Sequence, residues 1–200
     1  RRLGPFVKTR HNWPMTVFRA AFFALLISIA SSWAKTGSAD QSNTRLDSLF
    51  SQLQATSSET EARALEKLIW EIWLESGDEL VDRLMLGGVE AMGGGDYEKA
   101  LAAFNLIIED APDFAEGWNK RATLYWLLGD FEKSVEDINR TLALEPRHFG
   151  ALSGLAMIRE EQKRPLDALK AFERALKLYP AIRNASERIR ELSRQLGEPI

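Results

Sequence analysis

Three prolines constrain this chain more than any other feature, because Pro112, Pro146 and Pro180 lie 34 residues apart. Aligned on these prolines, the segment 95–108 (GDYEKALAAFNLII) matches 129–142 (GDFEKSVEDINRTL) and 163–176 (KRPLDALKAFERAL). Recurrence at a fixed period of this length indicates a structural unit repeated along the chain. Such units bury their apolar faces mainly against their neighbours, so the spacing predicts a stack of similar copies.

Each copy has the pattern of two helices. Trp118, Ala122 and Tyr125 are spaced i, i+4, i+7 and therefore share one helical stripe, which predicts that both aromatic residues are core. Trp126, one residue on, points elsewhere. Gly95-Asp96 and Gly129-Asp130 are typical of a turn followed by an N-cap, and each proline stops the second helix of its copy. No strand pattern occurs, so the predicted fold is all-helical, with roughly nine helices including the flanks.

On these residues the chain resembles the tetratricopeptide repeat (TPR) family, whose 34-residue unit is two antiparallel helices. The three copies are 81–114, 115–148 and 149–182, and the resemblance implies an all-α solenoid. In the second copy, the family's packing positions hold Trp118, Ala122, Tyr125, Gly129, Ser134, Ile138, Thr141 and Pro146. The third copy departs from the pattern, because Arg159 stands where an aromatic is common and Lys163 replaces the turn glycine.

Helical segments flank the repeats on both sides. Residues 40–80 predict a hairpin whose second helix opens with the capping box Ser58-x-x-Glu61. The 34-residue register sets Trp70 where Phe104 stands, so this hairpin is either a degenerate fourth repeat or an N-terminal cap. After the repeats, residues 183–200 predict a helix that covers the last unit, since stacked repeats expose an apolar face at their end. Its apolar stripe is Ile182, Ala185, Ile189, Leu192 and Leu196.

The N-terminal residues 1–39 differ from the rest in charge. They contain six basic residues and no acidic one, around an apolar run at 20–30. This plan predicts a secretory signal peptide, with cleavage after Ala34 or Ala39 and Met15 as the true start, and hence a periplasmic protein of a Gram-negative bacterium. The alternative is an uncleaved segment that anchors the protein in the inner membrane, although the run is shorter than the roughly 20 residues of a span.

Composition excludes several kinds of chemistry. The 26 basic and 29 acidic residues leave 20 and 29 after the leader is subtracted, a net charge of −9 that predicts no nucleic-acid partner. The chain has no cysteine and two histidines, of which His11 lies in the leader. His148 alone makes no metal site, and we interpret it as a solvated loop residue between two copies. We therefore expect no enzyme, no metal and no cofactor.

A second stripe runs beside the packing stripe on the first helix of each copy. In the TPR family this helix lines a concave groove, so the resemblance implies that the stripe is the partner-binding strip. It consists of Met85, Val89, Met92, Asn119, Thr123, Trp126, Ser153, Met157 and Glu160. Methionine adapts to varied peptides, which favours this role. The alternative is that the same side chains fill a tightly wound superhelix.

The sequence therefore predicts a non-enzymatic adaptor that binds a protein or an extended peptide. Some family members clamp the C-terminal carboxylate of cytosolic chaperones, but here Met85 and Val89 replace the matching Lys and Asn. The second hypothesis is a self-assembling or membrane-anchored scaffold of an envelope complex. It rests on the helix that contains Trp70 and on charge asymmetry, since residues 40–113 carry 5 basic and 16 acidic residues (net −11) and 159–200 carry 10 and 7 (net +3). A membrane contact is expected only if the leader is uncleaved, and the oligomeric state stays open.

Overall fold

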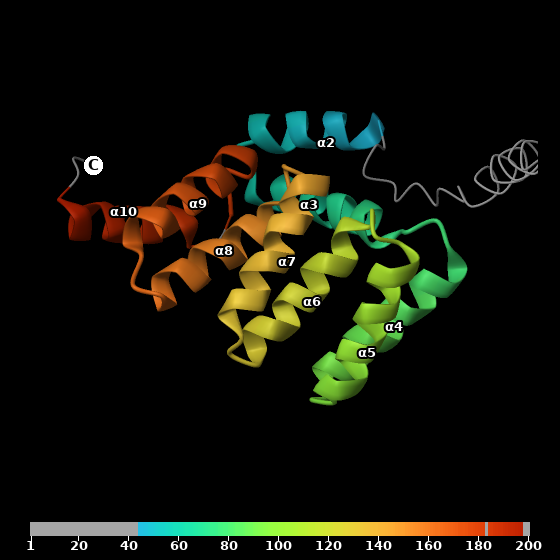
Figure 1. The fold of residues 1–200 in the computed structure, drawn as a ribbon. Coiled ribbons are helices and arrows are strands. Elements are labelled where there is room, and N and C mark those ends of the chain that lie inside the picture. Colours follow the sequence, from blue (N-terminus) through green and yellow to red (C-terminus); the bar gives the residue numbers. More distant parts are fainter. Residues whose placement is uncertain (1–43, 183, 198–200) are drawn as a thin grey trace, which may run out of the picture. The chain divides into compact units, whose positions relative to one another are not determined.

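The computed structural model describes residues 44–182 and 184–197, and the predicted leader 1–39 lies outside these residues (Figure 1). The described residues form nine helices and no strand, so the all-helical prediction is confirmed. No helix among them combines the length and apolar composition needed to cross a membrane. The helices are α2 (Thr44–Ala55), α3 (Glu59–Leu74), α4 (Glu79–Gly93), α5 (Tyr97–Asp110), α6 (Ala115–Leu127), α7 (Phe131–Leu144), α8 (Phe149–Glu161), α9 (Pro165–Leu178) and α10 (Ala185–Leu196).

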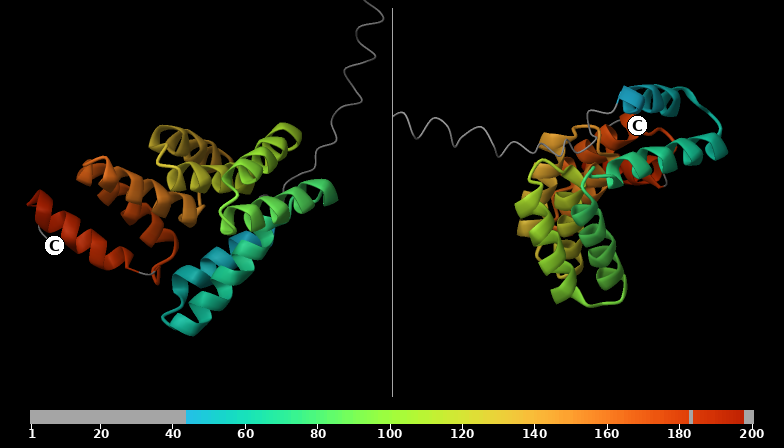
Figure 2. Two further views of the ribbon diagram at one scale, coloured as in Figure 1. Left: turned by 90° about the horizontal axis from the view of Figure 1, so that it is seen from below. Right: turned by 90° about the vertical axis from the view of Figure 1, so that its right-hand side faces the viewer.

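Three antiparallel helix pairs, α4–α5, α6–α7 and α8–α9, pack one after another (Figures 1 and 2). Successive pairs contact through α5 against α6 and α7 against α8. Close approach depends on small residues, since a Cβ on Gly117 of α6 would lie 2.7 Å from Ile107 Cγ2 of α5. Phe114 and Leu124 fill the space beside this glycine and are fully buried. The stack of helix pairs expected from the 34-residue period is therefore present.

The turns inside the three pairs share one backbone conformation. Gly95 and Gly129 have positive φ angles of 81° and 75°, and Lys163 takes the same place in the third pair with a φ of 56°. The side chains of Asp96 and Asp130 cap α5 and α7 by accepting a backbone N–H bond. The missing glycine has therefore not changed the turn, but it places a lysine in the left-handed region that favours glycine.

The helix α10 covers the last pair, as the stripe in residues 183–200 predicts. Its buried Ala185 and Leu192 pack against α9, where they meet Ala168 and Phe172 in one apolar cluster. Gly197 ends the helix with a φ of 72°. This helix therefore closes the C-terminal end of the stack.

The hairpin α2–α3 does not extend the stack at α4, which corrects its interpretation as a fourth repeat. Its buried apolar side packs on Phe149 at the start of α8 and Tyr179 at the end of α9. The cluster that α4 and α5 share with α6 contains no hairpin residue. The hairpin thus lies across the ends of helices from the second and third pairs (Figure 2).

The face of α4 explains this placement. In the second copy, α6 packs against α5 through a defined set of repeat positions. In the first copy, the same positions on α4 are occupied by Arg83, Gly87 and Glu90. A charged side chain at two of these positions disfavours packing of a preceding repeat there. Leu80, at the same repeat position as the buried Phe114, is 50% exposed. The hairpin therefore does not cover this side of α4, where charged residues stand beside exposed leucine.

The prediction that Trp118 and Tyr125 are core is only partly correct. Both side chains are half-buried, whereas Ala122 between them is buried. The guanidinium of Arg121 lies 5.1 Å from the Trp118 ring centroid and 5.7 Å from that of Tyr125, and it pairs with Asp137 of α7. The rings of Trp118 and Tyr125 thus flank a partly buried ion pair, because Arg121 lies between them on the surface of the helix.

Candidate functional site

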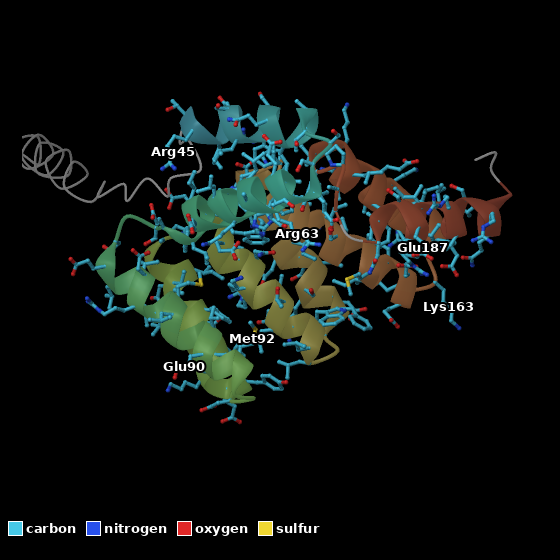
Figure 3. All side chains as sticks on the ribbon, turned by 180° about the vertical axis from the view of Figure 1, so that it is seen from behind. Arg45, Arg63, Glu90, Met92, Lys163 and Glu187 are labelled. Atoms are coloured by element: carbon cyan, nitrogen blue, oxygen red, sulfur yellow. The ribbon has the colours of Figure 1, made fainter. Side chains whose placement is uncertain are left out.

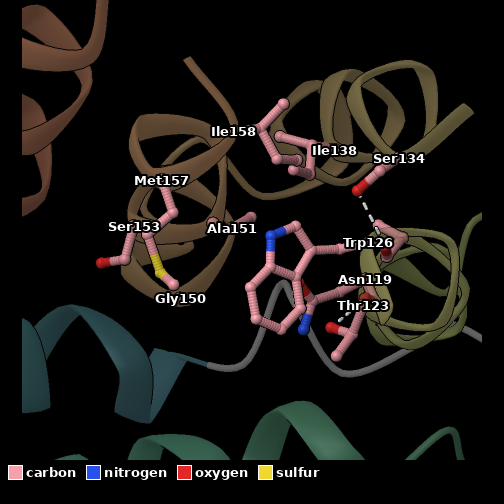
Figure 4. Close-up of a pocket in the computed structure, with 12 residues that line it drawn as sticks. Asn119, Thr123, Trp126, Ser134, Ile138, Gly150, Ala151, Ser153, Met157 and Ile158 are labelled. Carbon is pink, nitrogen blue, oxygen red and sulfur yellow. Dashed lines mark hydrogen bonds between the residues drawn. The ribbon is translucent and has the colours of Figure 1, made fainter. Parts of the chain in front are cut away.

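An apolar cavity of about 240 Å³ opens between α6 and α8, and α7 forms its floor (Figure 4). We call it the α6–α8 cavity. Trp126 and Met157 line the cavity, and 36% and 44% of their respective surfaces are exposed. Ala122, Gly150 and Gly154 leave the space open because their side chains are small or absent. The remaining lining residues are Asn119, Thr123, Ser134, Ile138, Ala151, Ser153 and Ile158.

A second cavity of about 420 Å³, the α8–α10 cavity, lies next to the first and shares Ser153 and Met157 with it. It is more polar, because Glu160 and Glu161 of α8 and Arg188 of α10 line it. The guanidinium of Arg188 pairs with the Glu160 carboxylate. The two cavities therefore form one interrupted groove that crosses α6, α8 and α10.

The structure brings together six residues of the predicted binding strip. Five of them, Asn119, Thr123, Trp126, Ser153 and Met157, line the α6–α8 cavity, and Glu160 lines its neighbour. Val89 and Met92 line neither cavity. Val89 is 36% exposed, and Met92 is half-buried near the C-terminal end of α4, where Figure 3 shows it beside Glu90.

Met85 is a correction to the predicted strip. It is 4% exposed and packs in the cluster that holds Phe104 and Ile107, so no partner reaches it in this structure. This stripe of α4 is core at Met85 because α4 packs against α6 of the second pair as well as against α5. The partner-binding role of the other strip residues stays a prediction.

A buried polar network supports the inner wall of the α6–α8 cavity. Asn119 Nδ2 donates to Glu116 Oε2 at 3.0 Å, and Lys120 Nζ lies 2.8 Å from Glu116 Oε1. The imidazole Nε2 of His148 lies 2.9 Å from Glu116 Oε2. Burial opposes ionisation of Glu116, but the hydrogen bond from His148 and the charge of Lys120 outweigh it, so the pKa of Glu116 is lowered. The carboxylate is therefore charged and held on three sides.

The burial of His148 contradicts its interpretation as a solvated loop residue. Only 1% of its surface is exposed, and its Nδ1 accepts the backbone N–H of Ala151 at 3.0 Å, which caps α8. Because Nδ1 accepts, Nε2 carries the proton that is donated to Glu116. The ring stacks on Trp73 of α3, with centroids 4.2 Å apart and planes 10° apart. The loop prediction failed because the hairpin covers this turn.

Trp70 of α3 links the hairpin to the cavity wall. Its ring lies under Lys120, whose Nζ is 5.4 Å from the ring centroid. A Cβ on Gly150, a cavity residue, would lie 2.8 Å from Trp70 Cη2. The hairpin therefore packs directly behind the residue that forms one end of the cavity.

Sequence reasoning missed the residues that open the cavity. Gly150 and Gly154 stand, by the 34-residue period, where the second copy has Glu116 and Lys120. Glycine stands at these two repeat positions in the third copy alone, which was a readable signal of missing side-chain volume. Glu116 had no comparable signal, because a charged residue in the first turn of a helix is ordinarily solvated.

Within the part of the chain that the structure describes, no three His, Cys, Asp or Glu side chains gather closely enough to hold a metal ion. The α6–α8 cavity carries no charged lining residue. The geometry thus offers a surface of mostly apolar groups with a few hydroxyl and amide groups. This combination can bind a side chain or a peptide segment.

Stacked 34-residue helix pairs with an open groove define a helical repeat protein. The chain belongs to the tetratricopeptide repeat family. The family model described as "Tetratricopeptide repeat" matches residues 85–140 and 119–181. A TPR repeat-containing protein of Rhizobium etli is 40% identical over 153 residues, which cover 76% of this chain and 75% of that protein. The tetratricopeptide repeat protein 36 homolog of Nematostella vectensis is 42% identical over 64 residues, 32% of this chain and 35% of that protein.

Solved structures agree on the fold. The first TPR of Spaghetti (RPAP3), bound to an HSP90 peptide, superposes with a TM-score of 0.56 at 24% identity, over 59% of this chain and 94% of that one. MamA superposes with a TM-score of 0.55 at 17% identity, over 58% of this chain and 68% of that one. At these identities the likeness concerns the fold alone.

Proposed function

We propose that this protein is a non-enzymatic adaptor that binds a protein or an extended peptide in the groove across α6, α8 and α10. The observation that carries the proposal is the α6–α8 cavity, which leaves an apolar space open between two well-packed helices. Trp126 and Met157 stay partly exposed at this space, although neighbouring apolar residues are buried. Peptide complexes of TPR domains, such as that of Spaghetti with an HSP90 peptide, support the same kind of partner.

We also propose that the adaptor acts in the bacterial periplasm. The support is the basic leader with its apolar run at 20–30. Intact mass and N-terminal sequencing of protein from fractionated cells test this location. A start at Lys35 or Asp40 in the soluble envelope fraction is the expected result. An intact leader in the membrane fraction would replace it with the anchored scaffold.

Site-specific photocrosslinking tests the binding groove in the full chain. A photoreactive amino acid at Thr123, which is exposed and lines the cavity, should yield a discrete adduct in cells. The same amino acid at Leu166, which is 44% exposed and lines neither cavity, is the matched control. Adducts that are equal at both positions, or present only at Leu166, would contradict binding in the groove.

A second candidate, self-assembly, is favoured by exposed apolar residues of α4. Leu80 and Leu86 of this helix are 50% and 71% exposed. Exposed apolar side chains on the first unit of a stack can meet another chain. Sedimentation velocity at low salt tests it. If the protein assembles, its sedimentation coefficient should rise with concentration. The rise should be smaller for Leu86→Glu. A constant monomer would exclude it.

A further inference from the structure

The chemistry of the α6–α8 cavity restricts what can enter it. None of the side chains that line it carries a charge, and its polar side-chain groups are three hydroxyls, one amide and the indole N–H of Trp126. A carboxylate or ammonium group placed inside would lose water without gaining an opposite charge, which is costly. Its volume of about 240 Å³ lies below the range of drug-sized ligand pockets. The occupant is therefore a single uncharged side chain.

The hydroxyls and the amide of the cavity already donate hydrogen bonds within the protein. Ser134 Oγ donates to the carbonyl of Ala122 at 2.7 Å, and Thr123 Oγ1 donates to the carbonyl of Asn119 at 2.9 Å. Asn119 itself donates to Glu116. Because these donors are committed, most of the contact offered to an occupant is apolar. A bulky aliphatic or aromatic side chain fits this surface best.

The surroundings of the cavity are acidic. Beside it, the α8–α10 cavity holds the carboxylates of Glu160 and Glu161 against one guanidinium, that of Arg188. Residues 44–113, which include the helices α3, α4 and α5 that contact α6, carry 15 acidic and 5 basic side chains, a net of −10. Opposite charge on a partner is attracted to such a surface and like charge is repelled. The residues next to the anchoring side chain should therefore be basic.

We propose that the α6–α8 cavity is the anchor site for one bulky uncharged side chain of an extended segment that carries lysine or arginine beside that anchor. The proposal rests on the proposed function, because it names the chemistry of the peptide bound in the same groove. It also separates the α6–α8 cavity from a site that binds a carboxylate, since no cation lines this cavity.

Defined peptides test the anchor on the full-length protein. The probe is a fluorescein-labelled, amidated nonapeptide of Gly and Ser with a central Trp between two Lys, followed by fluorescence anisotropy. Replacing the Trp with Ala should weaken binding at least about tenfold, as expected when an anchor in a closed pocket is removed. Replacing both Lys with Glu should weaken it as well. A version that ends in a free carboxylate at the Trp should bind more weakly than the amidated probe.

Two glycine variants locate the anchor in the molecule. A Cβ on Gly154 would meet only Ile138 Cδ1, at 3.7 Å, so the Cβ of Gly154→Leu fits without a clash, and the rest of its side chain is expected to occupy the cavity. We expect it to weaken the Trp probe at least about tenfold while the melting temperature stays unchanged or rises, because leucine favours helix more than glycine. Gly87→Leu is the matched control. A Cβ there meets nothing within 4 Å, and Gly87 lines neither cavity.

The outcomes separate this inference from the proposed function. Equal binding by both leucine variants overturns the anchor, and so does a panel in which no peptide binds. If Gly154→Leu abolishes binding but the acidic or carboxylate-ended peptide is preferred, the groove is the binding site and the anchor chemistry is wrong. A second result would have the same meaning. If Gly154→Leu abolishes the Thr123 photocrosslink but the unmodified protein does not bind the Trp probe, the groove is the binding site and the anchor chemistry is wrong.

Discussion

Single residues decide how far each copy follows the repeat pattern. Lys163 adopts a φ of 56° at the place where Gly95 and Gly129 turn the other two pairs. Its backbone N–H still donates to Glu160, so the turn is closed in the same way. The conformation is unfavourable for a residue with a Cβ, by about 1 kcal/mol, and glycine relieves it.

We expect Lys163→Gly to raise the free energy of unfolding by about 0.5–1 kcal/mol, because the gain in the folded turn exceeds the entropy that glycine adds to the unfolded chain. Urea denaturation followed by circular dichroism measures this change. Gly129→Ala is the matched control and should lower stability, since its φ is 75°. A destabilised Lys163→Gly would show that the lysine side chain contributes more than its backbone costs.

Gly150 is required for packing and not for a turn. Its φ is not positive, but neighbouring atoms leave no room for a side chain. An added Cβ would lie 2.8 Å from Trp70 Cη2 and 2.9 Å from Cζ2. Gly150→Ala should therefore displace Trp70 and lower the free energy of unfolding by about 1–3 kcal/mol, despite the better helix propensity of alanine. Urea denaturation and tryptophan fluorescence report both effects. Gly154→Ala on the same helix should be stabilising, and equal effects of the two changes would contradict the contact.

At the scale of elements, the hairpin is held on the repeats by aromatic and polar contacts at both of its helices. Arg147 Nη1 pairs with Asp47 Oδ1 of α2 at 2.6 Å, and the same guanidinium lies 4.9 Å from the Phe50 ring centroid. Tyr179 donates to Glu66 of α3 at 3.0 Å. The apolar cluster supplies most of the burial, and these contacts fix the position of the hairpin along it.

The contact between Tyr179 and Glu66 predicts a pH dependence. Burial, with the hydrogen bond to Glu66 and its charge, raises the pKa of Tyr179 from 10.0 to about 12. A folded-state pKa above the unfolded value means that the stabilisation is complete below pH 10 and is lost as the pH rises toward 12.

Protein stability should therefore fall between pH 10 and 12. Tyr179→Phe should be less stable at neutral pH by about 1 kcal/mol, but should lose this alkaline dependence. Urea denaturation at several pH values, with limited proteolysis of the hairpin, follows the change. Identical alkaline profiles for the two proteins would show that the hydroxyl does not hold the hairpin.

At the scale of the described helices as a whole, the hairpin contacts both the second and the third pair, which also meet each other through α7 and α8. Phe149 lies 6.3 Å from Phe50 and 5.3 Å from Tyr179, measured between ring centroids. Trp73 meets Phe149 at 5.1 Å and also stacks on His148. The third pair and the N-cap of α8 therefore share one aromatic cluster with the hairpin, and Lys120 of α6 lies over Trp70 of the same hairpin.

A chain without residues 1–75 should keep its helices and lose stability, because Phe149, His148 and Tyr179 become exposed. We expect a loss of several kcal/mol and faster amide exchange at the start of α8 and the end of α9, while α4 and α5 keep the protection they have. Hydrogen exchange with mass spectrometry measures this. Faster exchange spread evenly over all the helices, or confined to α4, would contradict the observed packing.

The repeat pairs, their turns and the C-terminal helix could all be predicted from the sequence. Helix spacing, caps such as Asp130 and the 34-residue period are local features, so the residues that define them lie near one another in the chain. The candidate strip could be predicted in part for the same reason, since Trp126 and Met157 follow helical spacing.

Tertiary structure alone decided the place of the hairpin, the burial of His148 and the opening of the α6–α8 cavity. Each depends on contacts between residues far apart in the chain, such as the 113 positions between Glu66 and Tyr179. An apolar face shows that a helix needs a partner but not which one, because burial of apolar surface is non-directional. Here the hairpin packs on the start of α8 because Trp70 and Trp73 fit against Phe149, and because α4 carries charged residues where a repeat would pack.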